Sequence, residues 1–132
     1  MIGTVVDEFA FGVEAGKVRE FARAIGDPTE GEGGVPLTFS VVAGHHRDAR
    51  AAVAKLGLDI RRVVVGEVEW EYARPLVVGD RLAARRVVAD VKTREGSRGG
   101  TMTLVTLETE FRDADGAVAL RQREILIETG AA

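Results

Sequence analysis

Two carboxylate side chains early in the chain are its best candidates for acid–base chemistry. Asp27 stands between a glycine and a proline, and Glu32 follows in the polar, glycine-rich stretch of residues 29–34. A carboxylate accepts a proton as a general base, and burial raises its pKa toward neutrality. Both residues also have plainer explanations, because Asp before Pro commonly opens a turn and Glu among glycines is typical of a solvated loop. For Asp27 the two explanations carry equal weight, whereas for Glu32 the solvated loop is preferred.

The residues before Asp27 predict a helix that positions it. Apolar side chains recur on one face at helical spacing, namely Val18, Phe21, Ala22 and Ile25. Gly26 suits the left-handed position that follows a helix, and Pro28 prevents its continuation. We therefore predict a helix from about Ala15 to Ile25. Asp27 would lie just beyond its C-terminus, where the helix dipole does not favour a carboxylate.

The rest of the chain changes from helical to strand periodicity. Residues 35–42 fit either a short strand or a helix start, and a second helix is predicted from about His46 to Leu56. Alternating apolar residues and turn signals then predict strands around Val68–Tyr72, Leu82–Val91, Thr101–Phe111 and Val118–Glu128, with a possible edge strand at Ile2–Val6. This order predicts an α+β fold, in which an antiparallel sheet wraps around a central helix.

Composition limits the classes of protein to which the chain can belong. Its 132 residues correspond to one domain over 1–132, and the net charge of −3 with scattered basic residues argues against a nucleic-acid-binding surface. No cysteine is present, so thiolate chemistry is excluded. Because the first residues lack a signal-peptide pattern and no apolar run is long enough to span a membrane, a cytoplasmic protein is expected.

The two histidines do not predict a metal site. His45 and His46 are adjacent, so on a helix they point in different directions, and we expect both to be exposed near a helix start. No spacing typical of a metal or cofactor motif occurs, and neither a metal nor a cofactor is expected. An arginine-rich set is likewise expected to form a solvated face, although it also offers a docking surface for an acidic carrier protein: Arg61, Arg62, Arg81, Arg85 and Arg86.

Several short motifs together resemble one known family. They are Gly16–Ala22, Gly26–Pro28, Val35–Phe39, Val64–Glu67, Tyr72–Leu76, Val78–Asp80 and Gly99–Met102. The chain is similar, from roughly Phe11 to Thr129, to the MaoC-like dehydratase N-terminal family, with most similarity to the HadA-type subunit of bacterial (3R)-hydroxyacyl-ACP dehydratases. The resemblance implies a hotdog fold, in which two domains pair side by side to make one continuous sheet.

The resemblance also implies a role for each candidate residue. In this family a catalytic half carries Asp and His in the pattern Asp-x-Asn-Pro-x-His, whereas the HadA-type half lacks the pair and lines the acyl-chain channel. Asp27 matches the aspartate by position, but Glu32 stands where the histidine would be. A glutamate presents only acceptors when ionised, so it does not replace an imidazole that both donates and accepts.

The resemblance places the acyl-thioester contacts at three further points. The stretch Pro36, Leu37, Thr38 and Phe39 lies where the oxyanion-hole loop would run, and Gly66, Tyr72 and Arg74 belong to the other motifs. Arg74 would meet a phosphate of CoA or of a carrier-protein arm. The alternatives remain open: Leu37 and Phe39 fit a hydrophobic core, and Arg74 fits a surface salt bridge to the glutamates at 67, 69 and 71, which are expected on the solvent side of their strand.

These observations predict an acyl-thioester-binding subunit of a fatty-acid-type dehydratase (hydratase), inactive or weakly active alone. Its partners would be an acyl-CoA or acyl-carrier-protein thioester and a catalytic MaoC-like subunit, or a second copy of itself. The alternatives are a self-sufficient enoyl-CoA hydratase homodimer and a hotdog acyl-CoA thioesterase, for which the second helix offers only Asp48.

Overall fold

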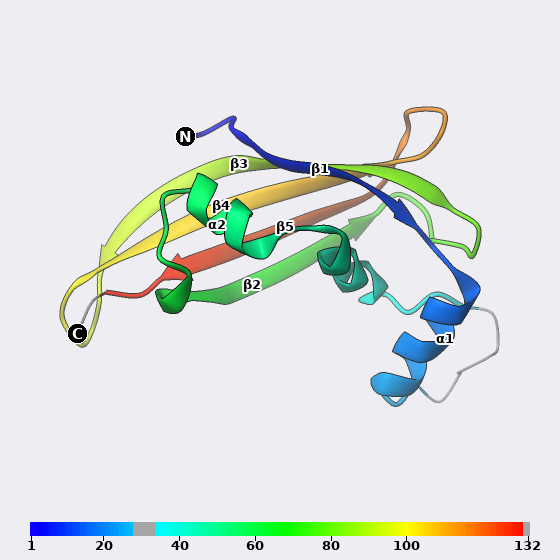
Figure 1. The fold of residues 1–132 in the computed structure, drawn as a ribbon, viewed down its shortest axis with the longest axis horizontal. Helices are drawn as coiled ribbons and strands as arrows, with labels where there is room; N and C mark the ends of the chain where they lie inside the picture. The colour runs from blue at the N-terminus through cyan, green and yellow to red at the C-terminus, as the bar shows by residue number, and fades with distance from the viewer. Residues whose placement is uncertain (28–33, 131–132) are drawn as a thin grey trace.

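One antiparallel sheet of five strands organises the molecule (Figure 1). The computed structural model describes residues 1–27 and 34–130. The strands are β1 (Val5–Gly12), β2 (Val63–Tyr72), β3 (Arg81–Glu95), β4 (Thr101–Arg112) and β5 (Val118–Glu128). Their order across the sheet is β1-β3-β4-β5-β2, so β1 and β2 form the two edges. The predicted α+β class is therefore confirmed.

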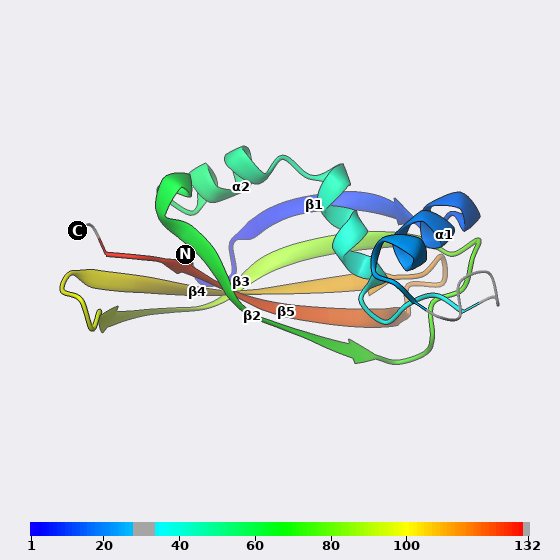
Figure 2. The same ribbon diagram turned by 90° about the horizontal axis from the view of Figure 1, so that it is seen from below.

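The helices gather on one face of the curved sheet, which we call the inner face (Figure 2). They are α1 (Ala15–Ala24), the 3-10 helix η1 (Phe39–His46), α2 (Ala49–Lys55) and the short 3-10 helix η2 (Ile60–Arg62). Within the described residues, the opposite outer face carries no helix. None of the helices in residues 1–27 and 34–130 is long and apolar enough to cross a membrane.

Helix α1 ends as its sequence predicts. Gly26 adopts a φ of 68°, and the Asp27 N–H donates to the Ala22 carbonyl at 2.9 Å, which closes the last turn in a Schellman-type cap. Val18 and Ala22 are buried, but Ile25, predicted on the same apolar face, is 51% exposed because it already lies at the C-cap. The cap leaves Asp27 half-buried at the point where the described chain is interrupted.

The central helix differs from its prediction. Instead of one helix over 46–56, helical structure begins at Phe39 as η1, breaks at Arg47, and resumes as α2. Arg47 is extended, with φ −122° and ψ 150°, and the Asp48 carboxylate accepts a hydrogen bond from the Ala51 N–H at 3.0 Å. Asp48 thus caps a new helix, a role in which a short acidic side chain is favoured.

The strands match their predictions in number, but three have different bounds. β2 begins at Val63 instead of near Val68, because it pairs with β5 from Glu128 onward. The edge strand lies at Val5–Gly12 instead of 2–6, because its backbone follows β3 in register as far as Arg81. β3 extends to Glu95 because β4 pairs with it as far as the hairpin. β5 begins and ends as predicted, and the turn before it is closed by the Asp113 carboxylate, which accepts from the Asp115 and Ala117 N–H groups at 3.0 Å.

The inner face holds two separate hydrophobic clusters. One lies under α1 and η1, and it is formed by Phe11, Val13, Val18, Phe39, Val42, Ala43, Leu76, Leu82, Ala84, Phe111, Ala119 and Leu120. The other lies under α2, and it is formed by Val6, Ala52, Leu56, Val88, Val105, Leu107 and Leu126. Polar residues occupy the inner positions between them, at the point where the central helix breaks.

Candidate functional site

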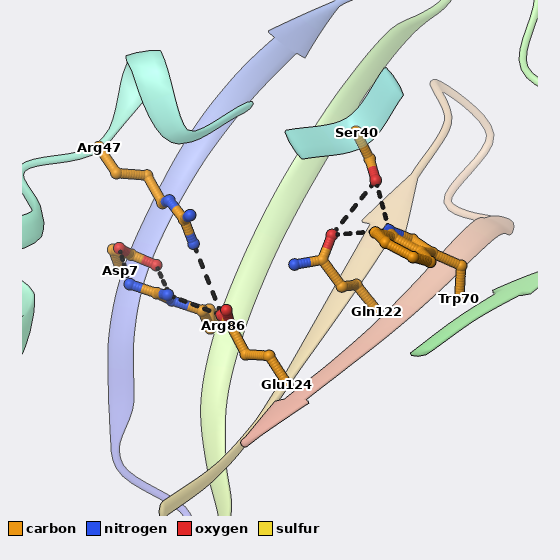
Figure 3. Close-up of polar contacts among 7 residues, drawn as sticks. All are labelled: Asp7, Ser40, Arg47, Trp70, Arg86, Gln122 and Glu124. Atoms are coloured by element: carbon orange, nitrogen blue, oxygen red, sulfur yellow. Dashed lines mark hydrogen bonds and ion pairs between the residues drawn. The ribbon is translucent and has the colours of Figure 1, made fainter. Parts of the chain in front are cut away.

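A polar belt crosses the inner face between the two hydrophobic clusters. We define the inner polar belt by eight residues: Asp7, Ser40, Arg47, Trp70, Arg86, Thr109, Gln122 and Glu124 (Figure 3 shows all of them except Thr109). Strand register places one member on each strand in a single row, from Asp7 through Arg86, Thr109 and Gln122 to Trp70. Ser40 and Arg47 reach the row from η1 and from the helix break.

Arg86 is the centre of the ionic half of this belt. Its guanidinium donates to both Asp7 carboxylate oxygens at 3.0 and 2.8 Å, and to Glu124 Oε1 at 2.8 Å. Arg47 Nη1 lies 3.8 Å from the same Glu124 oxygen. The side chains of Arg86 and Glu124 are only 6% and 8% exposed, so these charges are paired within the protein interior. Burial, and then the positive charge of Arg86, lower the pKa of Arg47 from its usual value.

The neutral half of the belt surrounds the single tryptophan of the chain. Trp70 Nε1 donates to Ser40 Oγ at 2.8 Å and to Gln122 Oε1 at 3.1 Å, and Ser40 Oγ donates to Gln122 Oε1 at 3.2 Å. This triangle ties η1 to β5 and β2. Thr109 lies between the two halves, and in the described part of the chain its buried Oγ1 has no hydrogen-bond partner.

A cavity of about 250 Å³ lies between α2 and the sheet, next to the ionic half of the belt. We call it the α2 slot, and its lining residues are Gly44, Arg47, Ala49, Ala52, Val53, Leu56, Val63, Val65, Arg86, Glu124 and Leu126. Its walls are mostly apolar, and the paired charges of Arg47, Arg86 and Glu124 form one end. Val65 belongs to edge strand β2 and is 58% exposed, so this side of the slot lies at the edge of the sheet. Such a cavity suits an apolar ligand group, with the polar end fixing its position.

The structure brings several predicted site residues together at the start of η1. The Tyr72 hydroxyl donates to the Leu37 carbonyl, and the Phe39 N–H donates to the Pro36 carbonyl at 3.0 Å. Burial raises the pKa of Tyr72, which therefore stays a neutral donor at physiological pH. Thr38 is the half-buried N-cap of η1 and makes no side-chain cap bond. This loop is thus held to the inner side of β2, beside the neutral half of the belt.

Phe39 and Leu37 have opposite environments. Phe39 is fully buried and packs edge-on against Phe21, with ring centroids 5.6 Å apart, and at a tilt of 32° against Phe11, with centroids 5.8 Å apart. Leu37 is 71% exposed, so its interpretation as a core residue is wrong. The backbone before η1 turns this side chain outward while Tyr72 holds its carbonyl.

Arg74 is engaged in a local ion pair. Its guanidinium donates to Asp80 Oδ2 at 2.9 Å and Oδ1 at 3.2 Å, and Asp80 Oδ2 also accepts from the Val77 N–H at 2.8 Å. The hydrogen bonds from Arg74 hold the pKa of Asp80 below its usual value. The predicted salt bridge to a glutamate of β2 is wrong in its partner, because the loop returns Asp80 to within reach of both guanidinium nitrogens.

Replacing Asp80 with asparagine should lower the free energy of unfolding by about 1 kcal/mol near neutral pH, since charge-assisted hydrogen bonds are lost at a partly exposed site. The depressed pKa means that the carboxylate stabilises the fold above its unfolded pKa of about 3.9, and that this contribution disappears as the pH falls through the folded value. Denaturant unfolding at neutral and strongly acidic pH measures both. An unchanged difference between the two proteins in strong acid would contradict this account.

Within the described part of the chain, none of the remaining predicted residues lines the α2 slot. Gly66 is the extra residue of a β-bulge in β2, where an added Cβ would lie 2.6 Å from Ile127 Cδ1. Glu32 falls outside the described residues, so its position relative to Asp27 stays a prediction. His45 and His46 are exposed as expected, although they lie at the end of η1 and not at a helix start.

Sequence reasoning missed the inner polar belt. Arg86 was expected on a solvated face, but it is 5% exposed, because strand alternation places it on the same side as Ala84 and Val88. That alternation is visible in the sequence and could have identified the residue as buried. Its partners Asp7 and Glu124 come from β1 and β5, and nothing in the local sequence signals them. Within the described residues, no cluster of acidic and histidine side chains suits a metal ion.

Comparisons with known proteins agree with this architecture. The family model described as "FAS1-like, dehydratase domain region" matches residues 1–122. A UPF0336 protein of Thermobifida fusca (strain YX) is 32% identical over 128 residues, which cover 86% of this chain and 81% of the relative.

Two solved structures share the fold. The HadBC (3R-hydroxyacyl-ACP dehydratase) complex of Mycobacterium tuberculosis has a chain that superposes with a TM-score of 0.71 at 20% identity, covering 96% of both chains. A protein described as a MaoC-like dehydratase gives a TM-score of 0.80 at 22% identity, covering 98% of this chain and 42% of that one. These likenesses confirm the predicted hotdog fold.

Proposed function

Because the chain belongs to the family of FAS1-like dehydratase domain regions, we propose that it is the acyl-binding subunit of a (3R)-hydroxyacyl-thioester dehydratase. The α2 slot carries this proposal, because it is an apolar cavity open toward the sheet edge and bounded by fixed charges. In the proposed arrangement this chain holds the acyl tail, and a MaoC-like partner subunit carries the acid–base residues. The thioester is presented by CoA or by an acyl carrier protein.

Dehydration of a 3-hydroxyacyl thioester sets the demands on the complex. A base removes the α-proton, an acid protonates the leaving hydroxyl, and N–H donors stabilise the oxyanion that develops. This chain has Glu32 where the family motif has histidine, and both of its histidines lie at the far end of η1. The partner subunit therefore supplies the imidazole in the proposed reaction, and Asp27 is a vestige of the same motif.

The slot has dimensions that suit part of a fatty acyl chain. Its volume of about 250 Å³ corresponds to roughly eight methylene groups, if each takes about the 30 Å³ of a water molecule. Each methylene moved from water into the slot contributes about 0.8 kcal/mol of transfer free energy. At the ionic end two arginines, Arg47 and Arg86, are balanced by two carboxylates of the inner polar belt. This end therefore limits the depth of an apolar tail and carries no net charge that would require a charged ligand.

The break in the central helix supports this proposal, because Arg47 is extended at the break and its side chain lies 3.8 Å from Glu124 at the end of the slot. The loop at Pro36–Thr38 would contribute backbone contacts to the thioester, and Tyr72 fixes that loop through the Leu37 carbonyl. Arg74 would meet phosphate only by exchanging its contact with Asp80. Gly66 would act by giving β2 the bulge that sets the edge beside the slot.

Co-expression with a catalytic MaoC-like subunit tests the proposal directly. The chain alone should not hydrate crotonyl-CoA measurably, whereas the purified complex should do so faster than the partner alone. Brisk hydration by the isolated chain, abolished by Asp27→Asn, would instead establish a self-sufficient homodimer. A thiol-release assay on the same samples detects thioesterase activity, which is disfavoured here because the Asp48 carboxylate already caps α2.

A further inference from the structure

The outer face of the sheet carries charges that alternate in sign from strand to strand. One row across the sheet, set by strand register, consists of Glu8, Arg85, Glu110, Arg121 and Glu71. The next row repeats the pattern on β4, β5 and β2, with Glu108 opposite Arg123 and Arg123 opposite Glu69. In the first row, taken in the strand order β1-β3-β4-β5-β2, the signs are negative, positive, negative, positive and negative.

Side chains of opposite charge on neighbouring strands form ion pairs on this outer face. Arg85 Nε lies 3.1 Å from Glu8 Oε1, Arg123 Nη1 lies 2.9 Å from Glu108 Oε1, and Arg121 Nη2 lies 3.6 Å from Glu110 Oε2. Opposite charges directly across neighbouring strands stabilise pairing, and like charges in the same positions oppose it. The charge pattern thus favours one order of strands.

The pattern ends at β2, the edge strand with an unpaired side. Its outward positions Glu67, Glu69 and Glu71 are all exposed. The strand is ten residues long and contains neither proline nor lysine, two residues that commonly protect an edge from pairing. Val64 and Val65 are 52% and 58% exposed on the same strand. β1, the other edge, carries a single outward glutamate, and Arg85 already pairs with it.

A second copy of the chain fits this edge poorly. In an antiparallel twofold pairing that keeps the outer faces continuous, Glu69 opposite its own copy places Glu67 opposite Glu71. Shifting the pairing by two residues in either direction still places Glu69 opposite Glu67 or Glu71. Every such register that overlaps the three glutamates therefore brings like charges together, which is unfavourable.

We infer that the β2 edge pairs with an antiparallel strand of a different chain that carries lysine or arginine at alternate outward positions. Such a strand would extend the charge alternation by one more step. This inference rests on the proposed function for the partner's identity, a catalytic subunit whose strand would lie next to Val65 and the α2 slot. The preference of the β2 edge for a positively charged strand concerns this edge alone, and it is tested without that subunit.

The test uses this chain and a charge-reversed version of it, Glu67→Lys/Glu69→Lys/Glu71→Lys. Sedimentation velocity at low salt should show that an equimolar mixture associates at least tenfold more tightly than either protein alone. The difference should shrink at high salt, where exposed charges are screened. Circular dichroism confirms that the variant is folded. If it is not, the Glu67→Gln/Glu69→Gln/Glu71→Gln variant replaces it, and it should self-associate more tightly than the natural chain.

A matched control carries the same charge change away from β2, as Glu14→Lys/Glu20→Lys/Glu95→Lys. Mixing this control with the natural chain should give no gain in association. The inference would be overturned if the control mixture associated as tightly as the charge-reversed mixture. It would also be overturned if the natural chain self-associated as tightly as the charge-reversed mixture, or if that mixture did not associate. None of these outcomes involves hydration of an acyl thioester, so a failure here leaves the proposed function standing, and the converse also holds.

Discussion

Replacing Arg86 with methionine should lower the free energy of unfolding by about 3–5 kcal/mol. The substitution keeps much of the side-chain length but removes the cation that pairs with both Asp7 and Glu124. Their side chains are 20% and 8% exposed, so two carboxylates would stay in a poorly hydrated place. Among residues 1–27 and 34–130, Arg47, 3.8 Å from Glu124, would be the one remaining cation paired with either carboxylate. Leaving a buried charge without its partner costs far more than losing an exposed pair.

The neighbouring arginine provides a matched control. Arg85 makes the same kind of bond to Glu8 across the same two strands, but its side chain is 60% exposed. Arg85→Met should therefore cost only about 0–1 kcal/mol. Urea unfolding of both variants measures the difference. Adding Glu124→Gln to Arg86→Met should recover part of the lost free energy of unfolding. A double-mutant cycle of the two substitutions gives the coupling free energy between the side chains at positions 86 and 124. Equal effects at positions 85 and 86 would contradict the buried ion-pair account.

The parts of the fold that local sequence specifies agree with prediction. Helix α1 is determined by apolar spacing and by Gly26, and β5 by its alternation between two turns, and both have nearly the predicted bounds. The break at Arg47 was not predicted, because residues 46–48 contain neither glycine nor proline to interrupt a helix. At the break Arg47 is extended, and its side chain lies 3.8 Å from Glu124, a residue far away in the sequence.

The candidate site shows the same division between local and distant information. The Tyr72–Leu37 contact joins two motifs that were each identified in the sequence, but their meeting depends on the path of η1. The α2 slot was not predicted, because its lining comes from α2, β2 and β5 and its end from the inner polar belt. Apolar periodicity indicates which residues face inward, but it does not indicate where packing leaves a cavity.

Filling the α2 slot should selectively weaken binding of long acyl chains. Ala49 lines the slot and is exposed at the start of α2, so a phenylalanine at this position extends into the cavity without displacing the buried core. Ala49→Phe should reduce the affinity for a decyl thioether of pantetheine at least tenfold. Loss of only two buried methylene groups already accounts for about 1.6 kcal/mol, which is more than a tenfold effect. Affinity for the ethyl analogue, whose tail is too short to fill the slot, should change little.

Ala54→Phe separates loss of the slot from a general effect on the helix. Ala54 is exposed on α2 but does not line the slot, so its replacement brings the same change in helix propensity and leaves the cavity open. Isothermal titration of both variants with the ethyl and decyl analogues gives four affinities, and only that of Ala49→Phe for the decyl analogue should fall. Unchanged decyl binding by Ala49→Phe would place the acyl tail elsewhere. A similar loss in both variants would mean that α2 as a whole, and not the cavity beneath it, governs binding.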